Sequence, residues 1–301
     1  LYTQPAYYLS SCADEIYLNP EGLIFFQGIN AKPMFMKEMF DKLGLEMQVI
    51  RGKNNKFKSA VEPFMYNEMS EENRAQTSKL IFSIWDHVVN EVAASRAITI
   101  DNVNRIADEL LGLFPDSALA NGFIDGLKYN DEIESILAEK LSGDLLDKDQ
   151  LVELKKYTHT KTRKSKSADF RKKKVAVVYA VGDMMGGEGD DETIGSDRIS
   201  EALREARLDT NVKAIVLRVN SPGGSALAAD VIWREAMLIQ NEKPFIVSMG
   251  DYAASGGYYI SAPADRIFAE VNTITGSIGV FGLMPNAQGL LNDKLGIYFD
   301  G

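Results

Sequence analysis

Two glycine-rich segments of the sequence could place a reactive side chain or backbone N–H groups beside a substrate. The first, Asn220 to Ser225 (Asn-Ser-Pro-Gly-Gly-Ser), follows an apolar stretch and precedes a helical pattern. Glycine lets a backbone approach a ligand closely, and free N–H groups at a helix start attract negative charge. Such a turn can form an oxyanion hole. Glycine turns between a strand and a helix are also common as purely structural features.

The second segment, Gly250 to Tyr258, holds a serine directly before two glycines. Ser255 follows a predicted strand and opens a new helical pattern. A serine on a tight turn has an exposed hydroxyl with backbone donors beside it, which is the arrangement of a nucleophile. The alternative is that Ser255 only caps the helix. Because α/β sites collect at the carboxyl ends of parallel strands, two such segments together favour a site.

A base for this serine has to come from a residue type other than histidine or cysteine. The chain has one cysteine, Cys12, and two histidines. His87 lies in a helical pattern and His159 in a basic polar stretch, so we interpret both as packing or surface residues. A single cysteine also excludes an intrachain disulfide and a multi-cysteine zinc site. We therefore expect no metal or cofactor, and a base chosen from Lys, Asp, Glu or Tyr.

The elements that would position these residues are an alternation of strands and helices. In the second half, strands are predicted at 175–180, 213–219 and 244–249, with helices at 196–208 and 226–240. In the first half, strands are predicted at 15–18, 23–26 and 45–50, with helices at 33–43, from Ser70 onward, at 99–113 and at 131–141. Strands alternating with helices of this length predict an α/β fold with a parallel sheet covered by helices.

Charged residues are distributed unevenly along the chain. Residues 155–174 carry ten Lys or Arg and one acid, whereas the other 23 basic and 42 acidic residues give a charge of −19. We interpret the basic stretch as an exposed linker, with contact to an anionic membrane surface as the alternative. The acidic remainder argues against a nucleic-acid partner. The longest apolar run, 175–181, is far shorter than the ~20 residues that span a bilayer.

An internal repeat indicates how the chain is organised. Tyr7–Ile16 aligns with Tyr258–Ile267 at six identical positions of ten, with an offset of 251, and Asp41–Gly44 reappears at 293–296 with an offset of 252. We predict a tandem duplication. The back part of the N-terminal repeat would be 1–157, the basic linker 158–174, and the front part of the C-terminal repeat 175–301. The first residues read as the middle of a fold, so we expect a piece of a longer protein.

Four motifs in this order resemble the signal peptide peptidase A (protease IV) family, in its long tandem-repeat form. They are Ser221–Gly224, Ala253–Tyr258, Thr275–Gly279 and Phe57–Phe64. The resemblance implies a tandem-duplicated ClpP/crotonase-like fold and a serine endopeptidase that degrades cleaved signal peptides and other apolar peptides. It also implies a homo-oligomer, a tetramer in our prediction. The protein would sit at the cell inner membrane, through a single anchor outside this chain, with its catalytic part facing outside the cytoplasm.

The same resemblance assigns roles to residues. Ser255 would be the nucleophile, Lys58 the general base and Ser277 a helper hydroxyl oriented toward the lysine. The backbone N–H group of Gly223 or Gly224, together with that of Gly256, would line the oxyanion hole. A lysine is a base only when neutral, and burial favours that form. Serine with lysine is a known variant of the catalytic triad.

The repeat bears on these roles as well. Ser255 falls on Gln4 at the offset of 251, so the first repeat lacks a serine at the position of the nucleophile, and one site must combine Ser255 with Lys58. Spacing alone would also allow Lys58 to be a surface lysine beside Lys53 and Lys56.

Two other functions stay open at this point. A crotonase-like acyl-CoA hydratase or isomerase would need a catalytic Glu or Asp and no Ser255. A catalytically dead scaffold would cut no peptide at all.

Overall fold

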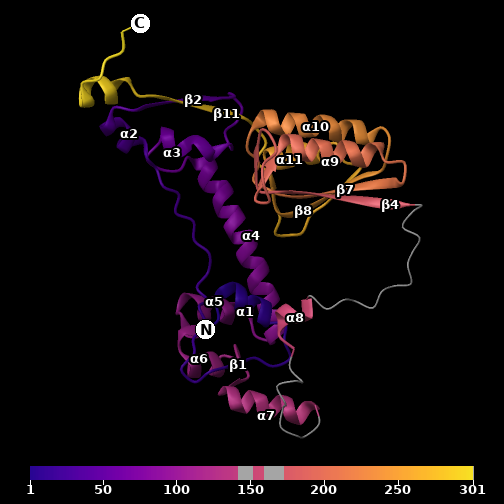
Figure 1. The fold of residues 1–301 in the computed structure, drawn as a ribbon. Helices are drawn as coiled ribbons and strands as arrows, with labels where there is room; N and C mark the ends of the chain where they lie inside the picture. Colours follow the sequence, from indigo (N-terminus) through magenta and orange to yellow (C-terminus); the bar gives the residue numbers. More distant parts are fainter. Residues whose placement is uncertain (142–151, 159–172, 301) are drawn as a thin grey trace. The chain divides into compact units, whose positions relative to one another are not determined.

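The computed structural model describes residues 1–141, 152–158 and 173–300. The chain forms two compact units (Figure 1). Unit 1 comprises Leu1–Lys32 and Thr77–Lys164, and unit 2 comprises Pro33–Gln76 and Ser165–Gly301. Most of the predicted basic linker, residues 159–172, lies outside the described residues. No helix of the described ranges is both long and apolar enough to cross a membrane.

Unit 2 is built on a five-stranded sheet in which every described pair of strands is parallel. The strands are β4 (Lys174–Val181), β7 (Val212–Ser221), β8 (Phe245–Ala254), β9 (Arg266–Phe268) and β10 (Ile274–Gly276). Their order is β10-β8-β7-β4, and β9 pairs with the first half of β8. In the loop after β4, two short strands pair with each other: β5 (Asp183–Met185) and β6 (Thr193–Gly195). The predicted α/β class with a parallel sheet is confirmed.

Three helices lie together on one face of this sheet (Figure 1): α9 (Ser196–Leu208), α10 (Ala226–Gln240) and α11 (Gly256–Ser261). Alternate residues of β7, such as Ile215 and Leu217, are fully buried beneath them. On α10 the buried residues recur at helical spacing, and the Ser225 hydroxyl caps the helix by accepting from the Ala228 N–H. On the other face of the sheet, Tyr179 of β4 is 66% exposed, so no described helix covers it there.

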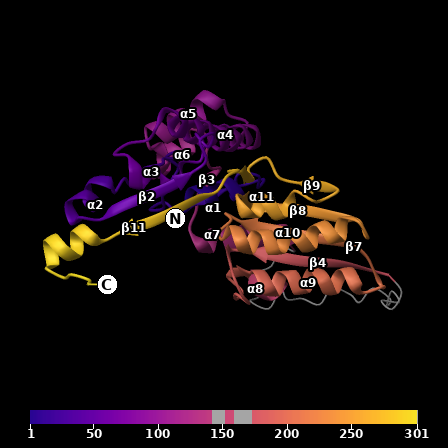
Figure 2. The same cartoon turned by 90° about the horizontal axis from the view of Figure 1, so that it is seen from above.

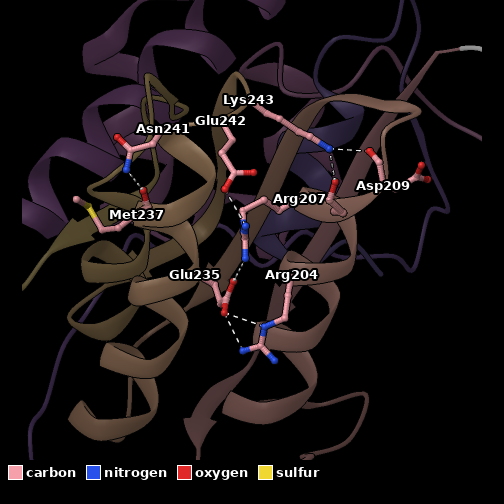
Figure 3. Close-up of polar contacts among 9 residues, drawn as sticks. Arg204, Arg207, Asp209, Glu235, Met237, Asn241, Glu242 and Lys243 are labelled. Carbon is pink, nitrogen blue, oxygen red and sulfur yellow. Dashed lines mark hydrogen bonds and ion pairs between the residues drawn. The ribbon is translucent and has the colours of Figure 1, made fainter.

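Helices α9 and α10 are joined by charged side chains (Figure 3). The Glu235 carboxylate is buried and accepts from Arg204 at 3.0 and 2.7 Å. Arg207 lies 3.7 Å from the other carboxylate oxygen and donates to Glu242 at 2.8 Å. Lys243 donates to the backbone carbonyls of residues 206 and 209, at the end of α9. The network therefore fixes how the two helices pack, since buried charges need their partners.

Removing the central carboxylate is expected to destabilise the protein. Glu235→Ala leaves Arg207, which is 14% exposed, without its buried partner. We expect the free energy of unfolding to fall by about 2 kcal/mol, less than for a fully buried pair because Arg204 is half exposed. Urea denaturation measures this change. Glu201→Ala, an exposed carboxylate on α9 without an ion pair in the described residues, is the control and should change stability by less than about 0.5 kcal/mol. Equal effects of the two substitutions would contradict the prediction.

The N-terminal part of unit 2 is tied to its C-terminal part by strand pairing. Residues 33–76 hold α2 (Lys37–Leu43), β2 (Glu46–Arg51), the 3-10 turn η1 (Ser59–Val61), α3 (Glu62–Met65) and the start of α4 (Glu71–Arg96). β2 pairs antiparallel with β11 (Phe281–Asn286), as Figure 2 shows. A further helical segment, η4 (Leu290–Leu295), follows β11. The compact units therefore do not follow the predicted division at 157 and 174, because these hydrogen bonds join segments that are remote in sequence.

Unit 1 is mostly helical. Its elements are α1 (Gln4–Ser10), β1 (Tyr17–Leu18), the rest of α4, α5 (Ile100–Asp108), η2 (Leu111–Leu113), α6 (Pro115–Ala120), β3 (Gly126–Leu127), α7 (Asn130–Leu141) and α8 (Leu154–Thr158). Tyr7 lies at the centre of the core, stacked on Phe123 with ring centroids 4.2 Å apart. The predicted strand 23–26 is reduced to one bridge, between Tyr2 and Ile24. The predicted helix 99–113 ends early, because Leu110 has a positive φ of 55°.

Several structural details recur at the spacing of the sequence repeat. The parallel bridge between Tyr2 and Ile24 corresponds, at an offset of 251, to the parallel pair Ala253–Thr275. Helices α2 and η4 end at glycines in the left-handed conformation, Gly44 with φ 74° and Gly296 with φ 67°. These correspondences agree with the predicted duplication.

Candidate active site

Ser255 lies on the sharp turn between β8 and α11. Its backbone has φ 53° and ψ −117°, which is unusual for a residue other than glycine. The turn is fixed by its N–H, which donates to the carbonyl of Gly276 at 2.8 Å. The side chain is half-buried at the carboxyl end of a central parallel strand. A strained turn of this kind presents the serine oxygen to a substrate.

Lys58, which lies 197 residues earlier in the sequence, contacts this serine. Its amine Nζ lies 3.1 Å from Ser255 Oγ and 3.0 Å from Ser277 Oγ, and it donates to the Ser277 carbonyl at 2.6 Å. Lys58 is 5% exposed and has no ion pair among the described residues. Burial lowers the pKa of the Lys58 amine below its ordinary value, because desolvation disfavours the charged form. The structure thus brings together the three side chains that the sequence predicted.

A buried carboxylate holds the segment that carries Lys58. Glu62, four residues further on, is 1% exposed and accepts hydrogen bonds from the Ser70 hydroxyl (2.6 Å) and the Asn73 amide (2.8 Å) at the start of α4. The neighbouring Ser59 hydroxyl accepts from Gln76 of the same helix at 2.7 Å. Glu62 was missed in the sequence reasoning. Its signal was a single acid within the otherwise apolar turn Val61-Glu62-Pro63-Phe64.

Ser277 follows β10 on a second strained turn, with φ 48°. Both its hydroxyl and its carbonyl face the lysine amine. Ser277 thus provides two acceptors for the amine, in addition to the Ser255 hydroxyl.

The three predicted oxyanion glycines differ in their hydrogen bonds. The N–H of Gly223 donates to the buried Ser221 hydroxyl at 3.1 Å. The N–H groups of Gly224 and Gly256 have no acceptor within the described part of the chain. Gly223, with φ 105°, instead allows close approach, since a Cβ there would lie 2.7 Å from that of Ser255. Gly224 and Gly256 are therefore the donors that remain for a ligand.

A pocket of about 520 Å³ opens beside Ser255. Small and apolar side chains form much of its lining, among them Ala226, Ala229, Ala262 and Val280. A larger pocket, of about 780 Å³, lies between α2, β2, α3 and η4 and does not include the serine. A peptide side chain beside the serine would therefore meet mainly apolar surface.

The fold is α/β. The site pairs a serine at the carboxyl end of a parallel strand with a buried lysine. The family profile that matches the sequence is that of peptidase family S49, over residues 2–143 and 237–301. The chain belongs to this family, and the resemblance to the signal peptide peptidase A (protease IV) family is confirmed.

Named relatives agree with this assignment. The chain is 38% identical to Protease 4 of Haemophilus influenzae and 35% identical to Protease 4 of Salmonella typhi, in each case over its full length and 49% and 48% of the relative. It is 33% identical to the chloroplastic serine protease SPPA of Arabidopsis thaliana, over 91% of this chain and 40% of the relative. The chain thus spans about half the length of these relatives or less. Nothing in these matches supports the acyl-CoA hydratase or isomerase alternative.

Proposed function

We propose that the protein is a serine endopeptidase in which Ser255 is the nucleophile and Lys58 the general base. The observation that carries this proposal is the buried Lys58 amine, 3.1 Å from Ser255 Oγ, with its pKa lowered by burial. Membership of family S49 supports it as well.

The proposed reaction follows ordinary acyl transfer. Neutral Lys58 accepts the proton of the Ser255 hydroxyl while Oγ attacks the carbonyl carbon of the peptide bond. The negative oxygen of the tetrahedral intermediate is stabilised by the N–H groups of Gly224 and Gly256. The lysine then gives its proton to the leaving amine, and an acyl-enzyme forms. Water, deprotonated by Lys58, hydrolyses that ester and restores the serine.

Ser277 has a positioning role in this scheme. Its carbonyl and hydroxyl accept the two hydrogens of the neutral amine, at 2.6 and 3.0 Å. The lone pair of the amine then faces Ser255, as proton transfer requires.

We further propose that the substrates are apolar peptides, with cleaved signal peptides as their source, since the pocket beside Ser255 is largely apolar. The whole protein would act at the cell inner membrane, with its catalytic part outside the cytoplasm, through an anchor outside this chain. It would also assemble as a homotetramer. The localisation, the anchor and the homotetramer rest on the family resemblance.

A series of fluorogenic peptides that differ only in the residue before the scissile bond tests both the activity and the specificity. We expect cleavage after Leu or Ala to be at least tenfold faster than after Asp or Lys, because a charged side chain loses its hydration in an apolar pocket. Faster cleavage after Asp or Lys would contradict the proposed specificity. Cleavage of no peptide by the full-length protein would favour the scaffold alternative.

A further inference from the structure

The lining of the pocket beside Ser255 includes a carboxylate without an ion pair among the described residues. Asp230, in the second turn of α10, lines this pocket and is exposed. The Tyr259 hydroxyl of α11 donates to its Oδ1 at 2.9 Å. Within the described residues Asp230 has no ion pair, and its second oxygen has no described partner. The pocket thus combines an apolar wall with a single fixed negative charge.

The carboxylate is held in place rather than free to swing away. The Tyr259 ring stacks on Trp233, with centroids 5.5 Å apart and planes 10° from parallel. Both aromatic residues flank the acid, one on its own helix and one on α11. This hydrogen bond occupies Oδ1 and leaves the second carboxylate oxygen available as an acceptor for a ligand.

Among the described residues, no cation forms an ion pair with this carboxylate. Arg234 follows Asp230 by one turn of α10 but forms no ion pair with it in the described structure. The Lys58 amine is directed to Ser255 and Ser277 instead. A ligand cation would therefore find a carboxylate whose charge is not already paired.

The pocket has room for a long side chain on the way to that carboxylate. Ala226, Ala229 and Ala262 have minimal side chains along its lining, and its volume is about 520 Å³. The aliphatic stem of a lysine or arginine two residues before the residue at Ser255 can bury against part of this surface while its charged end reaches Asp230. A short apolar side chain would leave part of this volume unfilled and the Asp230 carboxylate without a partner.

We infer that Asp230 selects a peptide that carries a cation near the cleaved bond. This inference rests on the proposed peptidase function. In an extended peptide, side chains two residues apart point the same way and lie roughly 7 Å apart. If the residue before the scissile bond (P1) lies beside Ser255, the residue two positions earlier (P3) lies over the Asp230 end. The selected group is the ammonium or guanidinium of Lys or Arg at P3, or the free amino group of a short peptide.

Two measurements on the same peptides test the inference. Acetylated peptides with Leu at P1 and Lys, Leu or Glu at P3 are cleaved by the wild-type protein and, separately, bound to the Ser255→Ala protein. We expect the order Lys, Leu, Glu in both assays, with about a fivefold change at each step for a partly exposed charge pair. Asp230→Asn should reduce the preference for Lys over Leu to below twofold, and Asp230→Lys should reverse the order of Lys and Glu.

Controls separate the possible outcomes. Glu201→Gln removes an exposed carboxylate from α9, outside the pocket, and should keep the wild-type order. Unacetylated tripeptides Leu-Xaa-Leu test whether the amino terminus is the selected cation. It is, if their binding and cleavage increase as much as those of the acetylated Lys peptides. An unchanged Lys-to-Leu ratio in Asp230→Asn, or equal or undetectable binding of all peptides, would overturn the inference. Binding with the expected order but without cleavage would overturn the peptidase function alone, and cleavage without the order would overturn only the role of Asp230.

Discussion

Ser255→Ala is expected to abolish peptide hydrolysis and to leave the thermal midpoint within a degree or two of the wild-type value. The hydroxyl would be the only attacking group of the proposed reaction, so its loss removes the chemistry. The side chain is half-buried on a turn, and removing one oxygen opens no core cavity. Hydrolysis of a fluorogenic Leu peptide and a thermal scan measure the two effects. A fluorophosphonate adduct, located by mass spectrometry, should lie on Ser255 in the wild-type protein.

The control for this prediction is a serine of unit 1. Ser135 is exposed on α7, and its hydroxyl donates only to the backbone carbonyl of Asp131. Ser135→Ala should retain full activity and the adduct. If Ser255→Ala kept more than a few per cent of activity, or if the adduct formed elsewhere, the assignment of the nucleophile would be wrong.

Lys58→Met is expected to be equally inactive, yet as stable as the wild-type protein or more stable at neutral pH. Methionine fills a similar volume and has no amine to desolvate. In the wild-type protein the folded-state pKa of Lys58 is below the unfolded value of about 10.4. Between these two pKa values the unfolded chain binds more protons, so this group makes stability rise with pH. The stability gain of Lys58→Met should therefore be greatest below the folded-state pKa and decrease as pH approaches 10.4.

The pH dependence of the rate provides the second test of Lys58. The wild-type rate should rise with pH along a limb that reports loss of the Lys58 proton, below about pH 10.4. Among the described residues His87 is the only histidine, and its ring is hydrogen-bonded to Tyr8 in unit 1. A limb near pH 6.5 that disappeared on replacing His87 or His159 would identify a histidine base and contradict the role of Lys58.

Sequence patterns predicted the local elements of unit 2 well, because periodicity and glycine turns are local signals. Helices α9 and α10 have the predicted bounds, whereas β8 continues to Ala254 instead of ending at 249, and no bounds were predicted for β9, β10 and β11. The motif that contains Lys58 was identified by resemblance, whereas spacing alone could not distinguish it from a surface lysine. Its burial depends on Ser277, which is 219 residues away. A single sequence does not encode such a contact in any local pattern.

Two further features could not have been predicted from pattern alone. The pairing of β2 with β11 depends on register between strands that are distant in sequence, and it places residues 33–76 in unit 2. The different hydrogen bonds of Gly223 and Gly224 depend on where the Ser221 hydroxyl lies. The two neighbouring glycines look equivalent in a sequence, but among the described residues only the Gly223 N–H has an acceptor once the loop is folded.

The pairing of β2 with β11 has a consequence for synthesis of the protein. Lys58 leaves the ribosome long before Phe281–Asn286 exist, and contacts between segments so far apart form late in folding. Until then its amine is hydrated, and we expect it to keep an ordinary pKa of about 10.4 and to be protonated. A nascent chain would therefore carry neither an activated serine nor a neutral lysine. We expect a competent site to form only after translation has passed β11.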